Sequence, residues 1–188
     1  MPGKRENYLS WEEYFLLICL VSRERSKDPR TQVGAVIVKN NRVLAIGYNG
    51  TPRGMTDDEM PWNSLGEETG DLFQIKNSFV IHAEANALNN LPLGTDLSEA
   101  TMYISLSPCS ECAKRIAQTG ITKVIYFQEY KQTAQANLAK YILQKAGIEC
   151  VQSQVTGLGE KLMLIGEKIF LEEEKQKKQV QKILYRKH

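Results

Sequence analysis

The chain has 188 residues, 42% hydrophobic and 24% charged, which is the balance of an ordinary globular protein with room for a core. Its net charge of +2, from 24 Lys and Arg against 22 Asp and Glu, lacks the basic excess typical of nucleic-acid-binding proteins. The sequence has no apolar run of about 18 residues and no continuous apolar stretch near its start, so we expect a cytoplasmic protein without a membrane partner.

The first part of the chain predicts a helix, a hairpin and a long loop. Ser10 and Glu13 have the spacing of a capping box, and apolar residues then recur at helical intervals. Two apolar runs at 33–38 and 43–48, separated by a polar turn, indicate the strands of a hairpin. Residues 49–78 are polar with little periodicity, and a loop of that length in a compact domain is usually functional or mobile.

The remainder alternates helices with short strands, which indicates α/β layers with helices on both faces of one sheet. The expected helices cover 82–90, 108–119 and 133–146, and the expected strands cover 101–106, 124–127 and 148–155. Beyond Gly157 an apolar helical stripe precedes acidic and then basic residues, which predicts a long solvated or self-associating helix. We therefore expect a single domain at 1–156 and a C-terminal helical tail at 157–188.

His82, Cys109 and Cys112 carry the side chains that zinc prefers, one imidazole and two thiols. The cysteines are three apart, so they share a face of the helix expected to open at Pro108. Three protein ligands leave a fourth position for water, as in catalytic rather than structural zinc sites. Glu84 follows the histidine by two residues, close enough to move protons at that water without binding the metal.

A structural or redox role for the cysteines is the alternative. A structural site needs a fourth ligand, but the only other histidine is His188, at the end of the chain. Cys19 and Cys150 lie in apolar patterns, so we expect them to be core thiols. The order His-x-Glu, then Pro-Cys-x-x-Cys, resembles the signature of zinc-dependent nucleobase deaminases. In such chemistry hydroxide attacks C4 of cytosine, while the glutamate protonates ring N3 and then the departing amino group.

Several blocks around these motifs resemble the deoxycytidylate (dCMP) deaminase family. The blocks are Ser26–Ala35, Gly47–Gly54, Asp57–Trp62 and Cys112–Lys114. The resemblance extends over roughly 10–151 and implies the three-layer α-β-α cytidine deaminase fold, an α/β fold whose five-stranded mixed sheet is flanked by helices. The C-terminal helix lies outside it. The implied activity is the zinc-dependent hydrolysis of dCMP to dUMP and ammonia, which supplies dUMP for thymidylate synthesis.

The same resemblance assigns roles to individual residues. It implies one catalytic zinc held by His82, Cys109 and Cys112, with Glu84 as the proton shuttle. Residues implied to form the pocket for the base are Val33, Asn49, Ala83, Ser107 and Pro108. Basic residues that are candidates for contacting a phosphate of the substrate or of an effector are Arg23, Arg25, Lys27, Arg30 and Arg53.

Regulation and assembly are also implied by the family. Many members are hexamers, respond to dCTP and dTTP as effectors, and use Mg²⁺ with the effector, so we expect a homo-oligomer with these partners. The chain departs from relatives at Ile81, Ser107 and Ser110, where cysteine, an aromatic residue and asparagine are familiar. The loop at 50–80 has no Cys or His, so we expect no second zinc.

Three other functions are compatible with the metal motif. A tRNA adenosine deaminase shares it, but the near-neutral charge and the block containing Asn49 favour dCMP. Another nucleobase or nucleoside deaminase would share it as well. A non-catalytic zinc-bearing scaffold would not need Glu84, because binding alone requires no proton transfer.

Overall fold

The structure is a computed structural model that describes residues 3–63, 65–130 and 134–185. It divides into two compact units, Met1–Gln154 and Val155–His188. The smaller unit contains one long helix, α6 (Leu158–Tyr185). Among the described residues, no helix combines the length and the apolar character needed to cross a membrane.

The larger unit is built on a five-stranded mixed sheet with the strand order β2-β1-β3-β4-β5. The strands are β1 (Gly34–Lys39), β2 (Arg42–Tyr48), β3 (Ala100–Leu106), β4 (Ile121–Gln128) and β5 (Glu149–Gln152). β1 pairs antiparallel with β2 and with β3, whereas β4 is parallel to β3 and β5 is parallel to β4. Asn40 and Asn41 form the hairpin turn with φ of 51° and 58°, values that asparagine tolerates well. The predicted hairpin and mixed sheet are confirmed.

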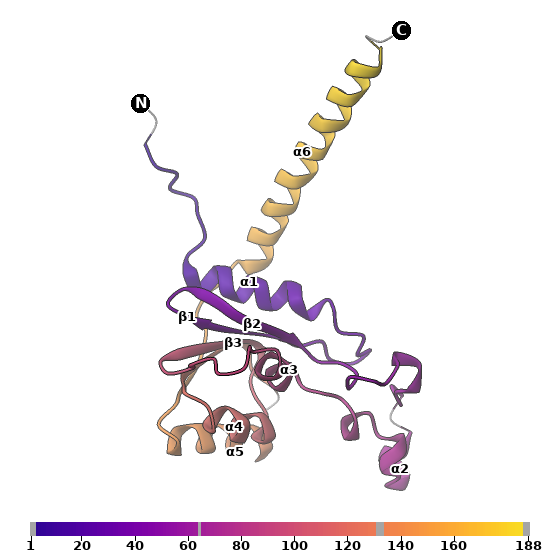
Figure 1. Cartoon of the computed structure of the whole chain (residues 1–188), viewed down its shortest axis with the longest axis vertical. Coiled ribbons are helices and arrows are strands. Elements are labelled where there is room, and N and C mark those ends of the chain that lie inside the picture. The colour runs from indigo at the N-terminus through magenta and orange to yellow at the C-terminus, as the bar shows by residue number, and fades with distance from the viewer. Residues whose placement is uncertain (1–2, 64, 131–133, 186–188) are drawn as a thin grey trace. The chain divides into compact units, whose positions relative to one another are not determined.

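Helices cover both faces of this sheet. α1 (Trp11–Arg23) packs on β1 and β3, and Figure 1 shows it on the face of the sheet opposite to three helices of the same unit. Those helices are α3 (Ala83–Asn89), α4 (Ser110–Ala117) and α5 (Ala134–Lys145). α3 packs on β2 and β1, and α5 packs on α4 and β5. The three-layer α-β-α architecture is therefore confirmed.

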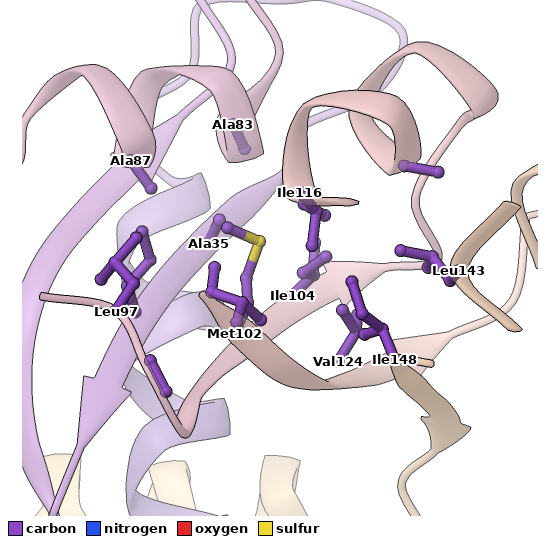
Figure 2. Close-up of a cluster of buried hydrophobic side chains, with 14 of the residues drawn as sticks. Ala35, Ala83, Ala87, Leu97, Met102, Ile104, Ile116, Val124, Leu143 and Ile148 are labelled. Atoms are coloured by element: carbon purple, nitrogen blue, oxygen red, sulfur yellow. The ribbon is translucent and has the colours of Figure 1, made fainter. Parts of the chain in front are cut away.

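The core lies between the sheet and the second helical layer. Met102 and Ile104 of the central strand are fully buried, and Ala83 and Ala87 of α3 belong to the same cluster (Figure 2). Gly47 of β2 allows α3 to come this close. A Cβ at Gly47 would lie 2.3 Å from the Ala87 nitrogen and 2.4 Å from the Ala83 oxygen. Glycine at this position therefore fixes where α3 begins.

Of two helix starts predicted from the sequence, one is confirmed and the other was wrong. The capping box at Ser10 is present: Glu13 N donates to Ser10 Oγ over 3.3 Å, and Ser10 N donates to Glu13 Oε2 over 2.7 Å. The prediction that Pro108 opens the next helix was wrong, because α4 begins at Ser110 with Cys109 as its N-cap. The Cys109 backbone stays extended, which lets its sulfur accept from the Cys112 N–H.

Where the structure describes it, the segment expected to be an irregular loop contains four single turns of helix. They are η1 (Asp57–Glu59), α2 (Gly66–Thr69), η2 (Leu72–Gln74) and η3 (Lys76–Ser78). Each is three or four residues long, too short to produce a hydrophobic period.

Candidate functional site

His82 is placed by the strand-like segment that precedes α3. Ile81 and Gly50 form an isolated antiparallel bridge, with N–O distances of 2.9 and 3.0 Å. His82 follows in extended conformation, with φ −68° and ψ 154°, and is the N-cap of α3. The imidazole therefore starts from a backbone that is anchored on one side by the bridge and on the other by the helix.

The two cysteines occupy the equivalent end of α4. Cys109 is its N-cap, and its Sγ accepts from Cys112 N at 3.5 Å. His82 Nδ1 lies 3.3 Å from Cys109 Sγ and 3.4 Å from Cys112 Sγ. Two helix starts, 27 residues apart between His82 and Cys109, thus converge on one point.

These three atoms fit a zinc ion. In a tetrahedral site with Zn–S of about 2.3 Å and Zn–N of about 2.0–2.1 Å, nitrogen and sulfur are about 3.5 Å apart. The two observed N–S distances are 3.3 and 3.4 Å, and the three donor atoms lie within 4.8 Å of one another. Within the described part of the chain the group has these three members, His82, Cys109 and Cys112. Cys19 is instead buried against β3, with its thiol donating to the Tyr103 carbonyl.

The environment of Cys109 favours the thiolate that a metal requires. Hydrogen bonding from the Cys112 thiol lowers the pKa of Cys109 to about 3, assisted by His82 and opposed by partial burial. A thiolate at this helix start is also stabilised by the adjacent backbone N–H of Cys112.

Glu84 lies in the first turn of α3, beside the three candidate ligands but not among them. Only 4% of the residue is exposed, and its charge interacts with those of His82 and Cys109. Burial raises the pKa of Glu84 above that of an ordinary glutamate. A carboxyl group of this kind can hold or release a proton next to the metal position.

The residues expected to bind the base fall into two groups. Ala83, Ser107 and Pro108 are neighbours of the candidate ligands along the chain. Ser107 is fixed at the end of β3 because its N–H donates to the Gln128 carbonyl and its Oγ accepts from Tyr130 N, both over 2.8 Å.

Val33 and Asn49 form the second group. Val33 N donates to Asn49 Oδ1 over 2.8 Å, so the segment before β1 and the end of β2 are held together. Asn49 is followed by Gly50, which pairs with Ile81, the residue before His82.

The five basic candidates do not act as one cluster. Arg25, Lys27 and Arg53 line a cavity of about 520 Å³, together with Tyr48, Asn86 and Asn90 among others. Lys27 also pairs with Asp57, an acidic residue of the same lining. Arg23 pairs with Glu24 over 3.2 Å and Arg30 pairs with Glu67 over 3.0 Å, and neither arginine lines the cavity. Of the described residues lining the cavity, none is Glu84 or a metal-ligand candidate. The described lining therefore leaves out the metal position, although it includes Ile81, the residue before His82.

Comparison with known proteins identifies the family. Residues 9–128 match the model of the cytidine and deoxycytidylate deaminase zinc-binding region. The chain belongs to this family. Its zinc-binding region contains His82, Cys109 and Cys112, the residues whose donor atoms converge in the structure.

Similar deaminases cover most of the chain. A probable deoxycytidylate deaminase of Drosophila melanogaster is 45% identical over 150 residues, 78% of this chain and 73% of the relative. The deoxycytidylate deaminase of Homo sapiens is 44% identical over 147 residues, 77% of this chain and 80% of the relative. The dCMP deaminase of cyanophage S-TIM5, crystallised with dCMP and dUMP, is 31% identical with a TM-score of 0.55. That match covers 81% of this chain and all of the phage protein.

Two polar networks near the deaminase site were not predicted from the sequence. Asn86 of α3 and Asn90, its C-cap, donate to the Tyr48 and Ile46 carbonyls of β2, over 2.7 and 2.9 Å. Their spacing of four residues places them on one helix face, so a shared polar contact of the two asparagines could have been predicted from the sequence. The second network joins Asp28 to Lys76, 48 residues apart, and no sequence pattern points to it.

Proposed function

We propose that this protein is a zinc-dependent dCMP deaminase, which converts dCMP and water into dUMP and ammonia in the cytoplasm and supplies dUMP for thymidylate synthesis. The observation that carries the proposal is the convergence of His82 Nδ1 and the two cysteine sulfurs at zinc-ligand distances beside the buried Glu84. The relatives named deoxycytidylate deaminase support the choice of substrate. We assign the activity to the domain at 1–156.

Each residue at the metal position has a distinct task in this reaction. His82, Cys109 and Cys112 hold the zinc, which when bound supplies an acidified water as the nucleophile. Glu84 accepts the proton of that water and passes it to N3 of the cytosine ring. Glu84 then takes the proton of the new hydroxyl group at C4 and gives it to the amino group, which leaves as ammonia as the C4–N bond breaks and the C4 carbonyl forms. Burial raises the pKa of Glu84, which favours its protonated form and so suits a group that carries protons.

The pocket for the base is assigned to Val33, Asn49, Ala83, Ser107 and Pro108. Ala83 and the segment at Ser107 and Pro108 flank the candidate ligands, so their backbone groups are available to the ring that reacts. Asn49 keeps a lone pair on Oδ1 after accepting from Val33 N, and this lone pair can accept from a substrate donor.

We infer that the cavity lined by Arg25, Lys27 and Arg53 binds a nucleotide phosphate. Because its described lining excludes the metal position, the cavity suits a dCTP or dTTP effector, accompanied by Mg²⁺, better than the reacting base. We also propose a homo-oligomer, hexameric as in many relatives. Exposed apolar side chains on α1, with Trp11 and Val21 each 56% exposed, are consistent with a subunit contact.

Ammonia release tests the proposal. The purified protein should deaminate dCMP, with dCTP, deoxycytidine, CMP and an RNA anticodon stem-loop as competing candidates, and should respond to added dCTP or dTTP. Deamination of the RNA but not of dCMP would refute the proposed substrate. An Arg53→Ala variant should lose the response to dCTP. A loss of dCMP turnover without effector in this variant would instead place the substrate phosphate in the cavity.

A further inference from the structure

A buried ion pair joins the segment before β1 to the segment between β2 and α3. Lys76 Nζ lies 2.7 Å from Asp28 Oδ2, and the two side chains are only 7% and 2% exposed. Burying two charges costs several kcal/mol in desolvation, and apolar residues of similar size often stabilise a fold equally well. Stability alone therefore does not account for this pair. The groups that the pair holds in place suggest another role for it.

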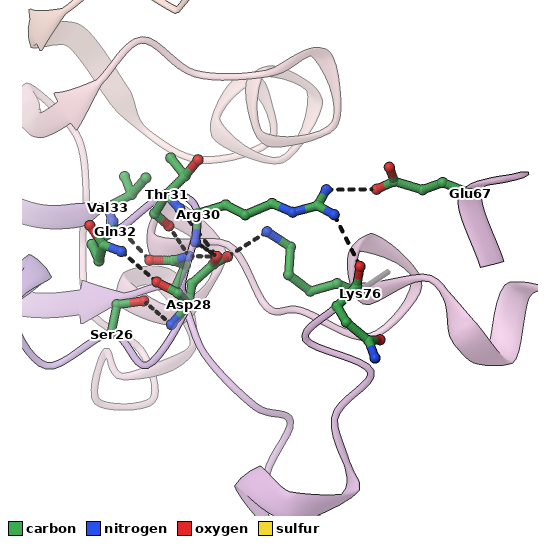
Figure 3. Close-up of polar contacts among 10 residues, drawn as sticks. Ser26, Asp28, Arg30, Thr31, Gln32, Val33, Glu67 and Lys76 are labelled. Carbon is green, nitrogen blue, oxygen red and sulfur yellow. Dashed lines mark hydrogen bonds and ion pairs between the residues drawn. The ribbon is translucent and has the colours of Figure 1, made fainter. Parts of the chain in front are cut away.

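Asp28 is the centre of a saturated hydrogen-bond network (Figure 3). Within the described residues, its Oδ1 accepts from the backbone N–H groups of Arg30 at 2.9 Å and Thr31 at 3.1 Å. Its Oδ2 accepts from Lys76 Nζ at 2.7 Å and from Asn49 Nδ2 at 3.2 Å. Each carboxylate oxygen thus has two donors, which is its normal capacity.

This network sets the orientation of the Asn49 amide. Asn49 Nδ2 donates to Asp28 Oδ2 and to the Thr31 carbonyl over 2.9 Å, so both of its hydrogens are used. Asn49 Oδ1 accepts from Val33 N, which fixes the oxygen on the other side. A flipped amide would place its NH₂ group against Val33 N–H and its oxygen against a carboxylate. Asn49 can therefore offer a ligand only the remaining lone pair of Oδ1.

Lys76 provides the positive charge that neutralises the buried Asp28 carboxylate. It comes from η3, in the aperiodic segment between β2 and α3. Arg30 makes exposed contacts to the same segment, at Glu67 and at the Asn63 carbonyl. Exposed pairs of this kind contribute little, typically below about 1 kcal/mol. The buried link through Lys76 is therefore the main polar tie between the segment and Asp28.

We propose that Asp28 is a positioning residue for substrate binding, and that Lys76 is its counter-ion. Asp28 holds Asn49 and the backbone from Arg30 to Val33 in the arrangement that meets the substrate, without touching it. The inference rests on the proposed function, because it assumes that Val33 and Asn49 contact the substrate. The inference adds an explanation of what holds Val33 and Asn49 in the geometry that binds the substrate.

The double variant Asp28→Asn/Lys76→Met separates positioning from stability. Removing both charges together leaves no unpaired buried charge, so the fold should be retained. The amide introduced at position 28 cannot replace the carboxylate, however, because donors face both of its ends. Whichever way it turns, its NH₂ group faces either Asn49 Nδ2 or the N–H groups of Arg30 and Thr31.

Steady-state kinetics on dCMP, zinc content and thermal unfolding are then compared with the native enzyme. We expect KM to rise about tenfold with kcat within about twofold, because binding is weakened while the proton chemistry at Glu84 is untouched. Zinc content should stay equal to that of the native protein. The matched control is Asp96→Asn, which removes an exposed carboxylate that accepts from Lys39 and Ser98, and it should change neither constant.

Unchanged KM in the double variant would overturn the inference, as would a fall in kcat alone. Loss of zinc or of cooperative unfolding would also overturn it, because Asp28 would then be a structural residue. Failure of the native protein to deaminate dCMP is a separate result, which refutes the proposed function before any variant is compared.

Discussion

Glu84 is enclosed by protein beside the metal position but contributes no ligand atom to it. Replacing it with alanine should therefore leave zinc binding intact and remove the proton transfers. We expect Glu84→Ala to retain native zinc content and to lose about 10²-fold or more in kcat, the usual contribution of a general acid–base group. Metal analysis and ammonia release on the same sample measure both. A fully active variant would show that another group moves the protons.

Cys109 has two tasks that two substitutions can separate. As the N-cap of α4 its sulfur accepts from Cys112 N, and as a candidate ligand it faces His82. Serine caps helices well but binds zinc poorly, whereas alanine does neither. Both Cys109→Ser and Cys109→Ala should lose zinc. In metal-free protein the serine variant should be more stable than the alanine variant by about 1 kcal/mol, measured by urea unfolding. Equal stabilities would mean that the cap contributes nothing.

Individual residues differ in how far the sequence predicts them. The candidate ligands and Glu84 could be predicted because their spacing along the chain matches a known chemical pattern, and the structure brings the three ligands together. The pairing of Asp28 with Lys76 could not be predicted. Their contact spans 48 residues, and Lys76 lies in a segment without periodicity. Burial of a lysine depends on the whole fold around it, so a local sequence pattern does not predict it.

Close packing of α3 on β2 depends on Gly47. Any side chain there would meet the backbone of Ala83 and Ala87, which cannot move aside as a flexible side chain would. We expect Gly47→Ala to destabilise the protein by about 1–3 kcal/mol through overpacking, and to reduce zinc affinity by shifting the start of α3. Urea unfolding and zinc titration measure the two effects. A Cβ at Gly50 would come no closer than 3.8 Å to the Tyr48 ring, so Gly50→Ala is the control for stability.

Helices and strands with a clear hydrophobic period were predictable, and their ends were less so. The sheet and its hairpin follow from the apolar runs and the polar turn. The start of α4 was misplaced because proline is common in the first turn of helices, whereas here the cysteine sulfur acts as the cap. That choice depends on the hydrogen bond between Cys109 and Cys112 N, which sequence spacing alone does not reveal.

Stability of the whole protein should fall in acid partly through Asp28. Burial raises the pKa of Asp28, but hydrogen bonds from Lys76, Arg30 and Thr31 outweigh it, so the pKa lies below its ordinary value. A carboxyl group with a lowered folded pKa stabilises the fold above its unfolded pKa of about 3.9. This stabilisation disappears as the pH falls through the lower, folded pKa.

The Asp28→Asn/Lys76→Met variant should therefore lose less stability than the native protein between about pH 4 and pH 2. Urea unfolding at several pH values in this range measures the difference. Parallel curves for the two proteins would show that Asp28 titrates in the folded protein as it does in the unfolded chain.

The side chains of Asn86 and Asn90 have a consequence for how copies of the protein can meet. β2 is one of the two edge strands of the sheet, and a bare strand edge invites a strand from another molecule to extend it. Here the amides of Asn86 in α3 and of its C-cap Asn90 cover the Tyr48 and Ile46 carbonyls, so a foreign strand would have to displace them first. The β2 edge is thus protected against pairing with strands of other molecules. Subunits should therefore associate through other surfaces.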